Sequence, residues 1–364
     1  MNSFFSRAFD TWRGRGAQAV TVPAMDGALH PNQRIEEAPV LIEALAPDNL
    51  VQAGGRALFS TGAEVHLLRT DGAPSARCFA RIDRPVSALA AHPSGAVAIG
   101  LAGRIELRGG ARDGKRFTEI GGRALTCPVA LAFADETTLI VALGSEQNPP
   151  ERWKHDLMER NASGSVWRLD LDSAEAVCLA DRLAWPCGLL PDADGSVLVS
   201  ESWRNQLLRV RQGARAQAAL TDIPGYPAGL SPAGDGDGTW LAVFAPRSQL
   251  VEFVLRERAY REQMMREVDP ALWIAPALSS GLSSREPMQV GGLMQLGIRK
   301  PWAPSRSYGL VIRLDSRAEP QFSFHSRADG RRHGVTSAVE TGGRLLAASN
   351  GGDVIVAISL SAAE

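Results

Sequence analysis

The sequence predicts an all-β fold, a six-bladed β-propeller, and three observations support it. Six lead-in segments, most of them containing a proline, each precede a short apolar strand, a Gly/Asp turn and a second apolar strand. The first five lead-ins start roughly 40 to 60 residues apart, close to the repeat of a propeller blade with four short strands. The 36 glycines and 22 prolines suit a soluble, turn-rich β-protein.

Taken in chain order, the first 36 residues lack the repeat and are expected to form an arm, whereas residues 37–364 are expected to form one propeller. The apolar run that starts at Pro39 should supply the outer strand of the last blade, which would close the ring and remove free sheet edges. The six lead-ins are Ala46-Pro47-Asp48, Arg84-Pro85-Val86, Cys127-Pro128-Val129, Trp185-Pro186-Cys187, Tyr226-Pro227-Ala228 and His333-Gly334-Val335.

Two units are longer than the others. In the third unit, residues 145–163 are predicted to be a shorter loop insertion between the second and third strands. In the fifth, residues 246–307 are predicted to be a lid insertion, whose first part has apolar residues at helical spacing from Ser248 onward. Because lead-ins and second-to-third-strand links lie on one face of a propeller, both insertions should cover the same mouth of the central channel.

The composition excludes several classes of function. The formal net charge is −1 and no basic stripe occurs, which argues against nucleic acid as a partner. The four cysteines form no CxxC pair, so neither a zinc site nor a disulfide framework is expected. A signal-peptide core and a long apolar run are both missing, which predicts no membrane span and a cytoplasmic location. The expected partner is a small molecule.

Several stretches resemble the strictosidine synthase-like proteins, over roughly residues 125–360. They are S200-E-S-W-R-N-Q-L-L-R-V, I223-P-G-Y-P-A-G-L, T239-W-L-A-V-F, Y308-G-L-V-I-R-L-D and V335-T-S-A-V-E-T-G-G-R-L-L-A-A-S-N. The resemblance implies a six-bladed propeller, distantly related to the calcium-dependent lactonases of the gluconolactonase and paraoxonase type. Thr336 stands where the alkaloid-forming synthases have a glutamate, so amine–aldehyde condensation is not expected. Cys187 and Ala228 stand where the lactonases have calcium ligands.

The position after the lead-in proline, read round the ring, gives one carboxylate, Asp48, followed by Val86, Val129, Cys187, Ala228 and Thr336. A calcium ion needs six to eight oxygens, so a divalent metal here would also need side chains from second-strand ends. The predicted ligand set is therefore Asp48, Glu146, Glu201 and Asn350. The alternatives are a salt bridge for Glu201, to Arg204 or Arg247, and a turn cap for Asp48.

Two functions follow as hypotheses. The first is a lactonase-like small-molecule hydrolase, with Glu201 as base or metal ligand and with His333 or Arg247 stabilising negative charge. Its substrate would contact Trp153, Trp185, Cys187 and Thr336. The second is a propeller that binds a ligand or a protein without catalysis. A metal-free reaction through Cys187 would need a lid histidine beside the sulfur.

Overall fold

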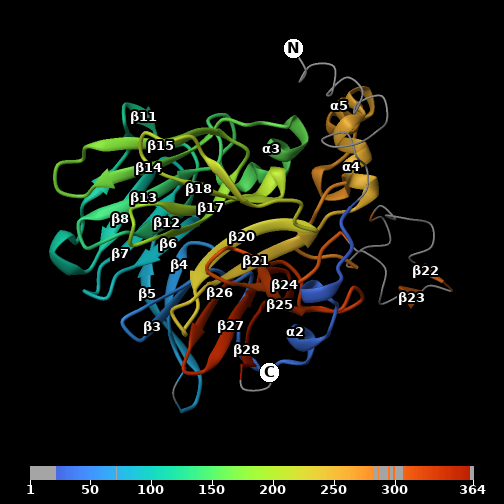
Figure 1. The fold of residues 1–364 in the computed structure, drawn as a ribbon, viewed down its shortest axis with the longest axis horizontal. Coiled ribbons are helices and arrows are strands. Elements are labelled where there is room, and N and C mark those ends of the chain that lie inside the picture. Colours follow the sequence, from blue (N-terminus) through green and yellow to red (C-terminus); the bar gives the residue numbers. More distant parts are fainter. Residues whose placement is uncertain are drawn as a thin grey trace.

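The computed structural model of this chain describes residues 22–70, 72–281, 286, 294–295, 298–299 and 306–360. The start of the predicted arm and much of the second half of the predicted lid lie outside the described residues. Within the described residues, six antiparallel sheets of four strands stand around a central axis, which confirms the six-bladed propeller (Figure 1).

Each of the first three blades runs outward from an inner strand. Blade 1 consists of β2 (Asp48–Ala53), β3 (Arg56–Thr61), β4 (Glu64–Arg69) and β5 (Ser75–Arg81). Blade 2 consists of β6 (Val86–Ala91), β7 (Val97–Leu101), β8 (Arg104–Arg108) and β9 (Arg116–Phe117), and is followed by a small hairpin of β10 (Glu119–Ile120) and β11 (Arg123–Ala124). Blade 3 consists of β12 (Pro128–Phe133), β13 (Thr138–Leu143), β14 (Gly164–Asp170) and β15 (Ala176–Leu183).

The next three blades complete the ring. Blade 4 consists of β16 (Pro186–Pro191), β17 (Val197–Glu201), β18 (Gln206–Val210) and β19 (Gln217–Leu220). Blade 5 consists of β20 (Gly225–Pro232), β21 (Thr239–Pro246), β24 (Leu310–Leu314) and β25 (Pro320–His325). Blade 6 consists of β26 (Val335–Thr341), β27 (Arg344–Ser349), β28 (Val354–Ser359) and β1 (Val40–Glu43), so every lead-in opens an inner strand.

The N-terminal side of the chain closes the ring. Strand β1 pairs antiparallel with β28, which confirms the prediction made for the apolar run after Pro39. Helix α2 (Arg34–Glu37) secures this contact, because the Glu36 carboxylate accepts hydrogen bonds from the backbone N–H groups of Arg331 and Arg332 at 3.0 and 3.3 Å. The Arg332 guanidinium in turn donates to the Ile35 carbonyl at 2.8 Å.

The core is divided among the interfaces between neighbouring blades. In the described residues, six apolar clusters each join one blade to the next. Between blades 2 and 3, for example, Ile105 and Leu107 pack with Leu139, Val141 and Trp167. Because both faces of each sheet are covered in this way, the middle strands are almost continuously apolar, as in other doubly covered sheets.

Both insertions contain helices. The blade 3 insertion, predicted as a loop, contains α3 (Trp153–Glu159), because Leu157 and Met158 bury one side of it. The blade 5 insertion begins with α4 (Gln249–Arg256) and α5 (Arg258–Glu267), separated at Glu257, where the sequence suggested one helix. The remaining described elements of this insertion are a 3-10 turn (Pro270–Leu272) and a short hairpin of β22 (Met294–Gln295) and β23 (Ile298–Arg299).

The two insertions meet above the ring. Lys154 of α3 donates to the Pro270 carbonyl at 3.2 Å, and the ring of His155 packs edge-on against Trp273 at 4.7 Å. In Figure 1, α3 and α4 lie toward the same end of the molecule. Within the described part of the chain, none of the helices has the length and apolar character needed to cross a lipid bilayer.

Candidate functional site at the channel mouth

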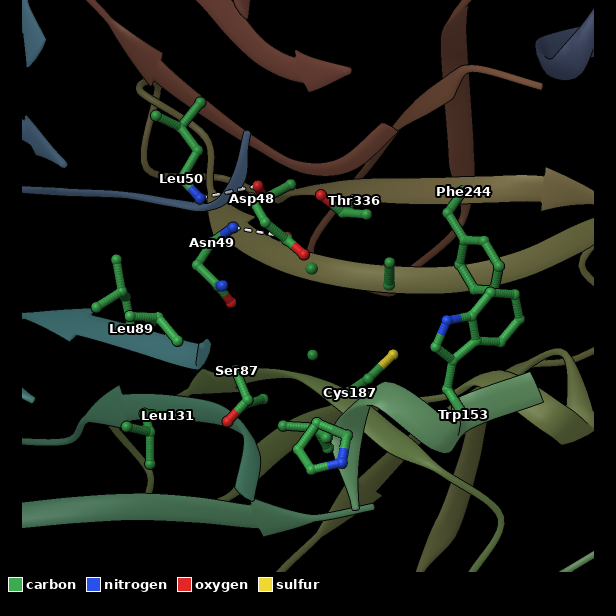
Figure 2. Close-up of a pocket in the computed structure, with 18 of the residues that line it drawn as sticks. Asp48, Asn49, Leu50, Ser87, Leu89, Leu131, Trp153, Cys187, Phe244 and Thr336 are labelled. Atoms are coloured by element: carbon green, nitrogen blue, oxygen red, sulfur yellow. Dashed lines mark hydrogen bonds between the residues drawn. The ribbon is translucent and has the colours of Figure 1, made fainter. Parts of the chain in front are cut away.

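A cavity of about 620 Å³ occupies one mouth of the central channel. The first strands of all six blades contribute to its wall, so it lies on the propeller axis. Trp153 from the blade 3 insertion lines it as well (Figure 2). Leu278 from the blade 5 insertion is also part of the lining, as expected if both insertions cover one mouth. The cavity therefore combines a rigid β wall with two inserted segments.

Irregular strand pairing determines which side chains reach the cavity. Each inner strand changes register against its neighbour within the first few residues, in the manner of a β-bulge, which redirects a side chain. The residues at these shifts that line the cavity include Asn49, Ser87, Val129, Cys187, Ala228 and Thr336. In blades 1 and 2 the shift thus adds Asn49 and Ser87 to the positions inferred from the prolines.

Asp48 is the carboxylate of the inner ring. It accepts a hydrogen bond from the backbone N–H of Asn49 at 2.6 Å, in a turn where Asn49 has a φ of 53°, a conformation that asparagine tolerates. Burial raises the pKa of Asp48, and the neighbouring Thr336 hydroxyl and the Asn49 N–H partly oppose the shift. Figure 2 shows Asp48 and Thr336 side by side on one wall.

The Thr336 hydroxyl has spare hydrogen-bonding capacity. Among the described residues its buried Oγ1 has no hydrogen-bond partner of regular geometry, although it lies close enough to affect Asp48. A buried hydroxyl without a partner costs free energy that a bound molecule can recover. Asp48 and Thr336 therefore present an acceptor and a donor to the same part of the cavity.

Cys187 also lines the cavity, but its thiol is engaged. The sulfur lies 3.0 Å from Ser202 Oγ and 3.2 Å from the Pro227 carbonyl oxygen. Burial raises the pKa of this thiol to about 11, so it stays protonated at neutral pH. Within the described residues the thiol contacts Ser200, Ser202 and the Pro227 carbonyl, and not the lid histidine that a thiolate nucleophile would require.

An aromatic wall, consisting of Trp153, Trp185, Trp203 and Phe244, forms another side of the cavity. Trp203 is at its centre: its ring stacks on Trp185 at 5.3 Å and meets Phe244 edge-on at 6.5 Å. Trp153 meets Phe244 edge-on at 5.5 Å. Such stacked and edge-on pairs are favourable arrangements of aromatic rings, so the wall is ordered before any ligand arrives.

The four residues predicted to contact a substrate come together at this cavity. Trp153, Trp185, Cys187 and Thr336 all belong to its lining. Their side chains come from blades 3, 4 and 6, so only the closed ring assembles them.

The three residues predicted to be catalytic lie elsewhere, which corrects their expected position. Glu201 is fully buried, where it accepts from the Ala184 N–H at 2.7 Å and pairs with Arg204, as the alternative interpretation stated. Both ring nitrogens of His333 are hydrogen-bonded, to Ser307 and to the Arg327 carbonyl, at 2.6 Å each.

Arg247 is paired as well, with Glu252 at 3.1 Å. Like Glu201 and His333, it is not among the residues that line the cavity. The polar groups of all three side chains are bound by other residues of the chain. They are therefore not available to a ligand in the cavity.

The predicted metal ligands do not converge. Asp48 lies at the cavity, whereas Glu146 is half-exposed in an ion pair with Arg123 at 2.5 Å. Asn350 donates to the Ala46 carbonyl at 3.3 Å, and Glu201 pairs with Arg204. The described residues contain no group of three or more acidic, histidine or cysteine side chains suited to a metal ion. This donor set does not fit calcium, which needs many oxygen ligands.

Sequence reasoning missed several residues of the site. Trp203 follows β17 and Phe244 lies near the end of β21, and neither is a carboxylate of the kind that a metal or acid–base site requires. Asn49 and Ser87 were missed because the ring was counted from the proline, and the register shifts fall after it. In blades 2 to 6 a small residue, such as Gly188, follows the shifted position, and this pattern carried a usable signal. A Cβ there would lie 2.1 Å from the Ala228 carbonyl oxygen of the adjacent blade.

Comparison with known proteins supports the fold. Neither the protein-family models nor the curated proteins contain a match to this sequence. A solved gluconolactonase of Xanthomonas campestris is 15% identical, with a TM-score of 0.54 over 87% of each chain. A solved putative gluconolactonase is 13% identical, with a TM-score of 0.52 over 89% of this chain and 91% of the other. At this identity, the likeness places the chain among propellers of this shape and shows its fold.

Proposed function

We propose that the protein is a small-molecule hydrolase of the lactonase type, which opens a cyclic ester in the channel-mouth cavity. The observation that supports it most is the position of Asp48, whose pKa is raised by burial, beside the Thr336 hydroxyl on the cavity wall. A carboxyl group tuned in this way within a mainly apolar cavity suits general acid–base chemistry. The two solved propellers described above as gluconolactonases make lactones the first substrates to test.

In the proposed reaction, the Asp48 carboxylate takes a proton from water while the water oxygen attacks the ester carbonyl carbon. Thr336 donates a hydrogen bond to the carbonyl oxygen as negative charge develops there. The bond between the carbonyl carbon and the ring oxygen then breaks, and the proton held by Asp48 passes to the leaving alkoxide. One lactone and one water thus give one hydroxy acid. Because the donor set does not fit a divalent metal, no step uses one.

The resemblance to strictosidine synthase-like proteins supports this proposal only at the level of ancestry. Thr336 lacks the charge of the glutamate that the resemblance would require for condensation, so we do not extend the proposal to that reaction. Binding without catalysis is the second candidate. This candidate is favoured because Glu201, His333 and Arg247 do not line the cavity. None of these three residues can therefore act as a second catalytic group beside Asp48.

Acid release from γ- and δ-lactones and from linear esters tests the proposal, with wild type, Asp48→Asn and Asp181→Asn compared. Asp181 is an exposed carboxylate near Arg182 and serves as the matched control. We expect turnover by wild type and the control, unaffected by a chelator, and a loss of at least about 100-fold in Asp48→Asn. Equal turnover by Asp48→Asn, or sensitivity to the chelator, would contradict the mechanism. Ligand binding without any turnover would establish the second candidate.

A further inference from the structure

We propose that the cavity selects a flat, mainly apolar ring compound over a polyhydroxylated one such as a sugar lactone, and that Asp156 holds the aromatic wall responsible for this choice. The inference rests on the proposed function in one respect: the ligand occupies the same cavity. It names the substrate class and adds a positioning residue that does not itself contact the ligand.

The polar side chains of the cavity wall have limited hydrogen-bonding capacity for a ligand. Ser87 Oγ donates to the Pro128 carbonyl at 2.6 Å, and Asn49 Nδ2 donates to Ser60 Oγ at 2.9 Å. Ser337 Oγ accepts from the Leu50 N–H at 2.9 Å. These bonds link strands or blades near the axis, so the Ser87 hydroxyl proton and one Asn49 N–H are unavailable to a ligand unless the bonds break. A compound with several hydroxyl groups would therefore bury some of them unpaired, at a cost for each.

The remaining hydrogen-bonding capacity of the inner wall lies at one place in the cavity. Asp48 and Thr336 lie side by side, which suits a ligand with a single polar group such as one ester. The charged side chains that also line the cavity, Arg84 and Glu151, are exposed to solvent. The rest of the ligand should be apolar, because aliphatic side chains from several inner strands line the cavity. They are Leu50, Leu89, Leu131, Leu189 and Leu230. A cavity of about 620 Å³ is ample for a compound of two or three fused rings.

The aromatic wall has a shape that suits flat rings. Trp185 and Trp203 are inclined by only 24° to each other, so the stacked pair presents flat surfaces. Phe244 stands at 76° to Trp203, which adds an edge beside the stack. Flat rings gain most from such surfaces, through stacking and edge-on contact beyond simple burial of area.

Asp156 fixes this wall from outside the cavity. Its carboxylate is fully buried on α3 and accepts the indole N–H of Trp203 at 2.9 Å. Its other oxygen accepts from Asn148 and Asn161 at 3.2 and 3.0 Å. The carboxylate is thus held by its own insertion while it sets the orientation of a tryptophan from blade 4. Asp156 is absent from the cavity lining, so it acts through Trp203.

Binding of two defined probes tests the ligand class. Coumarin is a flat aromatic lactone that hydrolyses slowly, and D-glucono-δ-lactone is a polyhydroxylated one of similar size. We expect coumarin to quench tryptophan fluorescence saturably and to raise the melting temperature, and glucono-δ-lactone to do neither at about 100-fold higher concentration. Initial rates of acid release from dihydrocoumarin and glucono-δ-lactone should show the same preference.

Four variants test the part played by Asp156. Trp203→Phe keeps a ring but loses the N–H, and Asp156→Ala loses the acceptor; each should weaken coumarin binding about threefold to tenfold. Asp156→Asn should restore most of the affinity, because an amide oxygen can still accept the indole N–H. Phe253→Ala, on the exposed side of α4, is the control and should bind as wild type does.

The outcomes separate this inference from the proposed function. Hydrolysis of glucono-δ-lactone without coumarin binding would overturn the ligand class and leave a lactonase in place. Coumarin binding without turnover of any ester would uphold the ligand class and remove the hydrolase. If neither probe binds, the ligand class is wrong. If Asp156→Asn binds coumarin as weakly as Asp156→Ala while both keep the wild-type melting temperature, the positioning role is wrong.

Discussion

Two regions of the propeller each hold one carboxylate near a strand end, and they differ in the hydrogen-bond partners of that carboxylate. At the end of β17 in blade 4, Glu201 receives hydrogen bonds from a backbone N–H, from Arg204 and from Gln206. At the start of β2 in blade 1, Asp48 accepts from its neighbour's N–H and otherwise faces the cavity. A carboxylate with its partners inside the chain stabilises the fold, whereas one with partners missing is available to a ligand.

The largest expected effect is on activity. Asp48→Asn should lower kcat/KM for lactone hydrolysis by about 100-fold or more, because the amide cannot take the proton from water. Glu201→Gln should stay within about twofold of wild type, because Glu201 does not reach the cavity. Steady-state kinetics on both variants measure the contrast. A large loss in Glu201→Gln with an unchanged melting temperature would reverse the roles given to the two carboxylates.

The pH dependence of Asp48 should sharpen the same contrast. Since burial raises the pKa of Asp48, wild-type activity should fall as pH drops through that raised value, where the base becomes protonated. The native state also holds this proton more tightly than the unfolded chain does, so this carboxyl lowers stability as pH rises past the ordinary aspartate range. Asp48→Asn should therefore have a higher melting temperature than wild type at pH 7. The difference should vanish in acid, where Asp48 is protonated in both states.

Glu201→Ala should mainly affect stability. It leaves the Ala184 N–H and one side of Arg204 without a partner, at a cost of about 2 kcal/mol in the free energy of unfolding. The cost stays below that of breaking a fully buried ion pair, because the Arg204 side chain is 47% exposed and water can solvate it. Urea unfolding at pH 7 measures the change, with Arg182→Ala as a surface control. An unchanged midpoint would mean that Glu201 does not hold this blade edge.

A smaller effect is expected for the donor beside Asp48. Thr336→Val keeps the shape of the side chain and removes its hydroxyl, so kcat should fall about tenfold while the fold is retained. Because this hydroxyl has no other partner of regular geometry in the described structure, its removal should not reduce the melting temperature. A lower melting temperature with unchanged kcat would assign Thr336 to the fold.

The smallest effect is expected for the cavity thiol. Cys187→Ala should change kcat/KM by less than about threefold, because a thiol whose pKa is raised to about 11 is a poor nucleophile at neutral pH. Lactone kinetics at pH 7, together with the rate of labelling by a small thiol reagent, measure this. An inactive Cys187→Ala variant would favour covalent catalysis through sulfur and replace Asp48 as the centre of the mechanism.

The propeller was predictable from the sequence because its repeat is carried by local features. Lead-in prolines, Gly/Asp turns and paired apolar strands are each readable within about ten residues, and their recurrence gives the blade number. The closing strand after Pro39 was equally readable, as an apolar run with no unit of its own. Trp153 and Trp185 were found for a similar reason, since one lies in an insertion and the other at a lead-in.

The roles of the carboxylates were not predictable in the same way. Whether Glu201 points to the channel or to Arg204 depends on the twist at the end of β17 and on a left-handed turn at Asn205, with a φ of 50°. The ring positions of Asn49 and Ser87 depend on register shifts, which arise from packing between strands of adjacent blades. The contact between Asp156 and Trp203 joins two blades and has no local sequence pattern.

The pairing of β1 with β28 also has a consequence for the order of events during protein synthesis. Strand β1 leaves the ribosome before any blade exists, and its partner emerges more than 300 residues later. Until then, the faces of blades 1 and 6 that share Leu50, Phe59, Leu346 and Ile355 have nothing to cover them. The growing chain is therefore an open arc whose two ends expose apolar strands, the kind of intermediate on which chaperones act. The cavity wall is completed only at the end of synthesis, because Thr336 reaches Asp48 when the last blade docks against the first.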